Sequence, residues 1–194
     1  LRDALIARGM PASRVSELVN EWRVVAHEPN TDSGFSATVF ERKSPLLGQP
    51  RYVFAARGTE GGLISVDMLR ANLGDLVANG LAWKQIIDMY NWWQELTTPE
   101  NQTYQRAVAA RVDGPQGGLS NFIIEAGQVW RIDRVATVQT RSARIDAQAP
   151  VDVTGHSLGG HLATAFSRLF ADVAVSTVTI NGAGYAATGV ASGN

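Results

Sequence analysis

Apolar and polar residues alternate along residues 35–41 (FSATVFE), as they do in a strand with one buried face. A second segment, residues 51–57 (RYVFAAR), is a short and more continuous apolar run. A cluster of turn-forming residues, 30–34 (NTDSG), precedes the first, and Pro45 and Pro50 lie between the two. The pattern predicts two strands, of which the second is the more apolar and the more central.

A helical period is found in other parts of the chain. It predicts helices over residues 1–9 and 16–25, over 81–96, and from Thr98-Pro99 to about residue 112. In 81–96 the apolar arc is wider than one helix face needs. This segment is either a core helix or, with 81–112 as a whole, a helical lid over a site. Residues 114–148 are expected to be an insertion that contains a strand hairpin.

The most informative stretch is 151–169, VDVTGHSLGGHLATAFSRL. Residues 151–154 have strand character, a tight Gly-x-Ser-x-Gly turn follows at once, and apolar spacing then predicts a helix to about residue 170. A further strand is expected over 173–180. The unit implies a right-handed parallel crossover, with both strands buried on both faces.

This context favours a nucleophile elbow with Ser157 as the catalytic nucleophile and Gly155, His156 and Gly159 shaping the turn. A Cβ at Gly155 or Gly159 would clash with the neighbouring strand or helix, and Gly160 lets the helix lie close to the sheet. The alternative is a plain glycine-rich turn or a phosphate loop. A phosphate loop would need a lysine in the turn, and a dinucleotide fold would need the spacing Gly-x-Gly-x-x-Gly. Residues 151–169 contain neither.

A serine nucleophile needs a histidine base and an orienting carboxylate. The three histidines are His27, far upstream, His156, within the turn, and His161, which is expected to be a partly exposed helix residue. After Ser157 the only carboxylate is Asp172. We therefore expect the catalytic Asp and His to lie outside this chain, in a missing C-terminal segment or in a second chain. The remaining alternative is an inert module.

Hydrolysis also needs two donors for the oxyanion of the tetrahedral intermediate. The amide of Leu158, directly after the nucleophile, is the first candidate. The second is Thr59, because Arg57-Gly58-Thr59 follows a predicted central strand and Gly58 permits a close turn. An ordinary strand-end turn is the alternative interpretation of Gly58-Thr59.

The pair of segments ARGTE, at residues 56–60, and VTGHSLGGHLA, at 153–163, resembles the class 3 lipase family of α/β-hydrolases. The resemblance extends over about residues 22–184, with Ala56 in place of the family's usual aromatic residue before Arg-Gly. It implies a single α/β-hydrolase domain over 1–194, a three-layer sandwich with a mostly parallel sheet, incomplete at the C-terminal end. It also implies a carboxylate, Asp67 or Asp75, that helps to hold the oxyanion loop.

The same resemblance implies hydrolysis of carboxylic esters, with lipid acyl esters as substrates and transient contact with a lipid interface. Phospholipase A or polyester hydrolase activity is the alternative among enzymes, and an inactive binding or toxin module is the alternative outside them. Some bacterial members of the family are modules of secreted proteins with calcium-binding repeats. A secreted location is therefore expected.

Composition adds few constraints. With 194 residues, 45% of them hydrophobic and 18% charged, the chain suits one globular domain. A net charge of −1 gives no bulk attraction to nucleic acid, so no nucleic-acid partner is expected. Cysteine is absent, and no metal motif such as His-Glu-x-x-His is found, so we expect neither a metal nor a cofactor. No apolar run reaches the roughly 18 residues of a membrane span.

Overall fold

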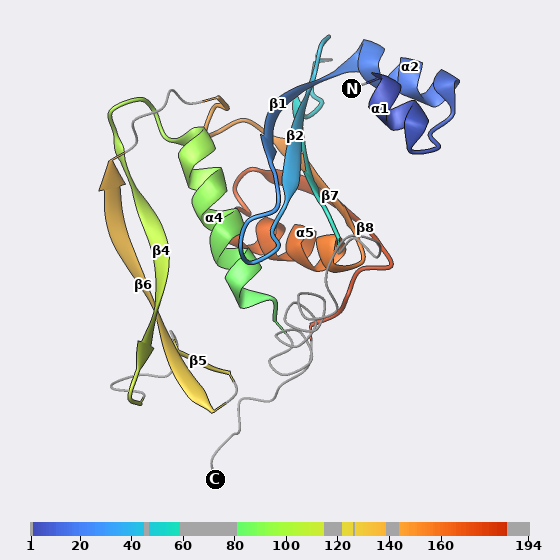
Figure 1. Cartoon of the computed structure of the whole chain (residues 1–194). Coiled ribbons are helices and arrows are strands. Elements are labelled where there is room, and N and C mark those ends of the chain that lie inside the picture. The colour runs from blue at the N-terminus through green and yellow to red at the C-terminus, as the bar shows by residue number, and fades with distance from the viewer. Residues whose placement is uncertain are drawn as a thin grey trace.

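The computed structural model describes residues 2–44, 47–58, 81–114, 122–125, 127–138 and 144–185. These residues form a five-stranded sheet and a three-stranded sheet, with two longer helices between them (Figure 1). Two short N-terminal helices, α1 (Arg2–Ala7) and α2 (Ala12–Glu21), lie at the N-terminal end of strand β1. The second predicted helix, over 16–25, is therefore only partly right, because the chain turns into strand β1 at Trp22.

The larger sheet has the order β1-β2-β3-β7-β8. Its strands are β1 (Trp22–Glu28), β2 (Ala37–Arg42), β3 (Tyr52–Ala56), β7 (Val151–His156) and β8 (Ala174–Ile180). Strands β1, β2 and β3 run antiparallel to one another, whereas β3, β7 and β8 are parallel. The sheet is thus mixed, and its two halves meet at the β3–β7 pair.

The expectation of a mostly parallel α/β-hydrolase sandwich is wrong. Two of the four strand pairs described in the larger sheet are antiparallel, and a separate antiparallel sheet accompanies it. Short connections explain the first half, since residues 29–36 and 43–51 are too few for the crossover that parallel neighbours need. The parallel neighbours β7 and β8 are joined through helix α5, and the parallel neighbours β3 and β7 are joined by a long connection that contains α4 and the smaller sheet.

The smaller sheet has the order β4-β6-β5, all antiparallel, with β4 (Thr103–Val112), β5 (Phe122–Glu125) and β6 (Gln128–Val138). The hairpin predicted within 114–148 is confirmed by the β5–β6 pair. The helix predicted from Thr98-Pro99 to residue 112 is wrong, because ten residues of β4 pair with β6. A helical lid over all of 81–112 is excluded for the same reason.

Helices α4 (Trp83–Thr97) and α5 (Leu158–Leu169) pack against each other and join the two sheets. Met89 and Trp93 of α4 are buried in the same core as Phe54 of β3 and Phe166 of α5. The Phe54 and Phe166 rings stack with their centroids 4.3 Å apart, and Trp93 meets Phe166 edge-on at 4.9 Å. The wide apolar arc of α4 therefore serves the core, which decides between the two interpretations of 81–96.

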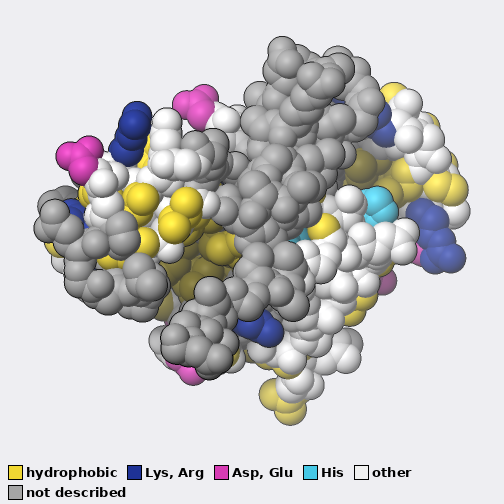
Figure 2. All heavy atoms as spheres, turned by 90° about the horizontal axis from the view of Figure 1, so that it is seen from below, with side chains coloured by type: hydrophobic (Ala, Val, Ile, Leu, Met, Phe, Trp, Pro, Cys, Tyr) yellow, Lys and Arg dark blue, Asp and Glu magenta, His cyan; other side chains and the backbone are white. Residues whose placement is uncertain are grey.

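The burial of strand β8 differs from the prediction. The parallel β7–β8 pair is confirmed, but all residues of β8 after Ala174 are exposed, including Val175, Val178 and Ile180. Burial on both faces was expected from the apolar composition alone. Exposed hydrophobic side chains also occur on the smaller sheet, at Ile124 and Val135, and Figure 2 shows hydrophobic side chains gathered on the side of the molecule that carries this sheet.

Candidate active site

Ser157 lies on a sharp turn between a strand and a helix. Strand β7 ends at His156, Ser157 has φ 55° and ψ −125°, and helix α5 begins at Leu158. A positive φ is uncommon outside glycine, and such backbone persists only where the surroundings hold it. The serine residue is exposed. A strained turn that presents a serine at the end of a strand is the geometry of a nucleophile elbow.

The glycines of the turn are required by close backbone contacts. A Cβ on Gly155 would lie 2.0 Å from the carbonyl oxygen of Gly159, and a Cβ on Gly159 would lie 2.4 Å from that of Ala56. A Cβ on Gly160 would lie 2.7 Å from the Cα of Gly182. Strand β7, helix α5 and the end of β3 therefore approach one another too closely for any side chain, as the spacing of the motif predicts.

The chain that follows strand β3 lies beside the elbow. Because β3 and β7 are parallel neighbours, with Ala56 opposite Gly155, both strands end at the same edge of the sheet. A Cβ on Gly58 would lie 2.6 Å from the carbonyl oxygen of His156 and 3.5 Å from the Cβ of Ser157. Arg57 and Gly58 thus lie beside the turn that carries Ser157, as expected. Thr59, the predicted second oxyanion donor, lies outside the described residues.

The first predicted oxyanion donor is at the start of helix α5. The carbonyl oxygen of Ser157 accepts hydrogen bonds from the amides of Gly160, at 2.9 Å, and His161, at 3.3 Å. The amide of Leu158 is the first of the helix and has no acceptor within it. The partial positive charge of the helix N-terminus favours an anion at this point.

Backbone hydrogen bonds from the chain around the end of β8 hold Ser157 from its other side. The Ser157 amide donates to the carbonyl of Ile180 at 3.0 Å, and the amide of Ala183 donates to the carbonyl of Ser157 at 3.1 Å. Sequence reasoning did not find either residue. The parallel arrangement of β7 and β8 was the available signal, because it brings the end of β8 beside the elbow.

His161 is fully buried, so its prediction as a partly exposed residue is wrong. Its Nε2 accepts a hydrogen bond from the Ala82 amide, and its Nδ1 donates to the carbonyl of Ala183, both at 3.3 Å. Burial lowers the pKa of the imidazole from its ordinary value of 6.5, against the opposing effect of backbone hydrogen bonds to Ala183 and Gly184. The ring is therefore neutral at neutral pH.

The other candidate groups for proton transfer are placed elsewhere. His156 is exposed in the turn, His27 is exposed on β1 with its Nδ1 2.9 Å from the Thr38 hydroxyl, and Asp172 is exposed beyond the end of α5. Within the described parts of the chain, no histidine forms a hydrogen bond with the Ser157 hydroxyl. Asp67 and Asp75 lie outside the described residues.

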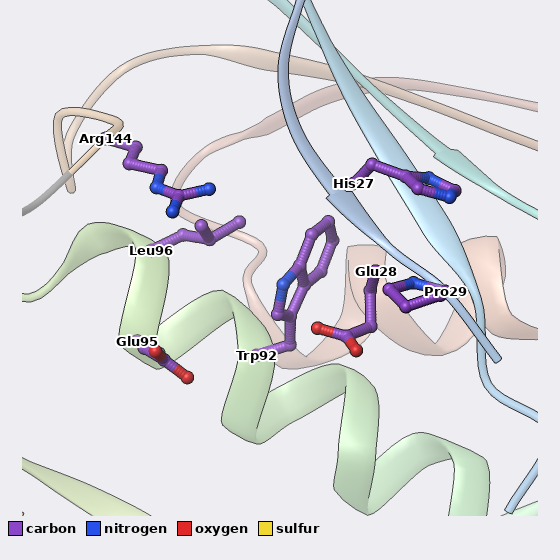
Figure 3. Close-up of a pocket in the computed structure, with 7 residues that line it drawn as sticks. All are labelled: His27, Glu28, Pro29, Trp92, Glu95, Leu96 and Arg144. Atoms are coloured by element: carbon purple, nitrogen blue, oxygen red, sulfur yellow. The ribbon is translucent and has the colours of Figure 1, made fainter. Parts of the chain in front are cut away.

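A cavity of about 270 Å³ opens between α4 and the end of β1. It is lined by His27, Glu28, Pro29, Trp92, Glu95, Leu96 and Arg144 (Figure 3). The imidazole of His27 is directed away from Trp92 and Glu28, and Ser157 does not line the cavity. We therefore do not assign this cavity to the elbow.

Among the described residues, no group of His, Asp and Glu is arranged to hold a metal ion, and no helix is both long enough and apolar enough to cross a bilayer. Comparisons with family models, with curated proteins and with solved structures found no match.

Proposed function

We propose that this protein hydrolyses carboxylic esters through an acyl-enzyme formed on Ser157. The observation that carries the proposal is the exposed serine with positive φ between β7 and α5, in contact with the chain that follows β3. The site and not the fold supports this function, because one fold serves many activities and one chemistry occurs on many folds.

In the proposed reaction the Ser157 hydroxyl attacks the ester carbonyl, its proton passes to a base, and the carbonyl oxygen becomes an oxyanion. The alcohol then leaves with a proton from the same base, and water hydrolyses the acyl-serine ester. The Leu158 amide and Thr59 stabilise the oxyanion. Loss of one such donor typically costs about 2.7–4 kcal/mol of transition-state stabilisation.

The base and its carboxylate are assigned to a histidine and an aspartate from outside this sequence. His161 is buried with both ring nitrogens engaged, and His27 and His156 form no hydrogen bond with the serine. The same observation favours a second candidate function, a lipase-like module that binds without catalysis. The two candidates differ in whether Ser157 is nucleophilic.

The similarity of residues 56–60 and 153–163 to class 3 lipases supports lipid acyl esters as the substrate class, with phospholipids or polyesters as further ester substrates. It likewise supports transient contact with a lipid interface and a secreted location. No cofactor is required, since the proposed steps use only a serine, hydrogen-bond donors and a proton carrier.

A fluorophosphonate probe tests the proposal, because it reacts with activated serines and mimics the tetrahedral intermediate. We expect the protein, in the form in which the cell makes it, to be labelled on the peptide that contains Ser157. Ser157→Ala should abolish labelling. Ser176→Ala, which removes an exposed serine of β8 bonded to Asp152, should leave it unchanged.

Labelling of another residue, or labelling that persists in Ser157→Ala, would contradict the proposed nucleophile. Absence of labelling from a protein with a normal circular dichroism spectrum and a cooperative melting transition would favour the binding module.

A further inference from the structure

We propose that His161 is a positioning residue for Ser157, which acts through a clamp that joins the start of α4 to the segment 181–185. The proposal rests on the proposed function of Ser157. The clamp consists of the His161 ring, Ala82, Ala183 and Tyr185.

The His161 ring joins two segments that are distant in sequence. Its Nε2 accepts the amide of Ala82, the residue directly before α4, and its Nδ1 donates to the carbonyl of Ala183 beyond β8. An amide can only donate and a carbonyl can only accept, so these partners fix the neutral tautomer with the proton on Nδ1. Both ring nitrogens are used in holding backbone.

Ala183 connects the His161 ring to Ser157. Its carbonyl accepts from His161, while its amide donates to the carbonyl of Ser157 at 3.1 Å. The strained backbone of Ser157 is therefore held by a residue that His161 holds in turn. Strain of this kind persists only when neighbouring structure determines it, so loosening Ala183 should allow Ser157 to relax.

Tyr185 covers one face of the His161 ring. The two rings stack with their centroids 4.0 Å apart, and the phenol donates a hydrogen bond of 2.8 Å to the His161 carbonyl. Burial raises the pKa of Tyr185 to about 12, against the opposing charge of Arg168, whose guanidinium lies over the phenol ring. The phenol stays protonated and able to donate at neutral pH.

His161 is not assigned as the base for Ser157. To take a proton, Nε2 would have to release the Ala82 amide, and the ring is fully buried without a carboxylate partner in the described parts of the chain. Its role is to hold the site and not to exchange protons with the substrate.

Three variants test the clamp. His161→Phe keeps an aromatic ring against Tyr185 but removes both ring hydrogen bonds, and His161→Gln restores one acceptor and one donor group. His27→Phe is the matched control, because His27 is exposed on β1 and its hydrogen bond among the described residues is with the Thr38 hydroxyl. The readouts are amide hydrogen exchange at Ala82 and Ala183, and the rate at which a fluorophosphonate labels Ser157.

We expect His161→Phe to accelerate exchange at both amides and to slow labelling about 10- to 100-fold, the range associated with small misplacement of a catalytic group. His161→Gln should recover part of both effects, and His27→Phe should show neither. Unchanged exchange in His161→Phe would overturn the clamp. Faster exchange with an unchanged labelling rate would show that the clamp does not position Ser157, while the proposed function would stand.

Failure of the proposed function has a different signature. If Ser157 is not labelled in the unmodified protein, the proposed function fails, and with it the positioning role, whatever the exchange at Ala82 and Ala183 shows. Should His161→Phe not fold, the comparison of His161→Gln with His27→Phe carries the same test. Faster exchange and slower labelling in His161→Gln are then expected, and equality with His27→Phe in both readouts would overturn the proposal.

Discussion

Replacing Phe166 with alanine is expected to lower the free energy of unfolding by about 3–5 kcal/mol, the usual result of truncating a fully buried aromatic side chain. Phe166 is fully buried and belongs to α5. Its ring contacts Phe54 of β3, Trp93 of α4 and Phe170 at the end of α5. The substitution would leave a cavity where two helices meet the larger sheet.

The measurement is urea unfolding followed by tryptophan fluorescence, with the midpoint and slope fitted separately. Ile124→Ala is the matched control, because Ile124 is 62% exposed on β5 and little burial is lost. A change below about 1 kcal/mol for Phe166→Ala, within the range of ordinary single substitutions, would contradict the packing described for this core.

Gly155→Ala is expected to destabilise the protein by about 3 kcal/mol, at the upper end of the usual range for overpacking, and to abolish labelling of Ser157. The new methyl group would lie 2.0 Å from the carbonyl oxygen of Gly159 and 2.7 Å from the amide of Gly160. Both contacts are with backbone, which cannot move aside as a side chain can. Helix α5 would have to move away from β7, and the elbow between them would open.

Gly114→Ala is the control for this prediction, since a Cβ there meets nothing within 4 Å. Thermal melting and fluorophosphonate labelling should both be nearly unchanged in the control. If Gly155→Ala melts and is labelled like the unmodified protein, the close approach of β7 and α5 is incorrect.

The elbow could be predicted from the sequence because its determinants are local. The strand, the turn and the helix follow one another within 151–169, and the glycines at 155, 159 and 160 are fixed by contacts that the turn itself creates. The position of Arg57-Gly58 beside the turn was also predictable. An oxyanion donor must come from a loop that follows a central strand, and strands β3 and β7 are parallel neighbours that end at the same edge of the sheet.

The sheet order could not be predicted in the same way. Strand β4 contains Ala107, Ala109 and Ala110, which favour a helix in isolation, but pairing with β6 along its whole length decides its structure. The sequence resemblance implied a mostly parallel sheet, and this expectation was wrong. The two segments that carry the resemblance most clearly, 56–60 and 153–163, leave the direction of β1 and β2 undetermined.

Burial was the other property that the sequence did not determine. The apolar, β-branched residues of β8 suggested a strand covered on both faces, and a histidine in the first turns of α5 suggested an exposed position. The burial of β8 and the burial of His161 both depend on which segments pack against them. His161 is covered by Tyr185 and by the residue before α4, neither of which is near it in sequence.

The central claim, that Ser157 is a nucleophile, is tested most directly by trapping the acyl-enzyme. The protein is mixed with a p-nitrophenyl ester, quenched in acid within the first turnover, digested and analysed by mass spectrometry. The account predicts a burst of p-nitrophenol and one acyl group on the peptide that contains Ser157, both absent from Ser157→Ala. Ester hydrolysis that continues in Ser157→Ala, or an acyl group found only on another residue, would contradict it.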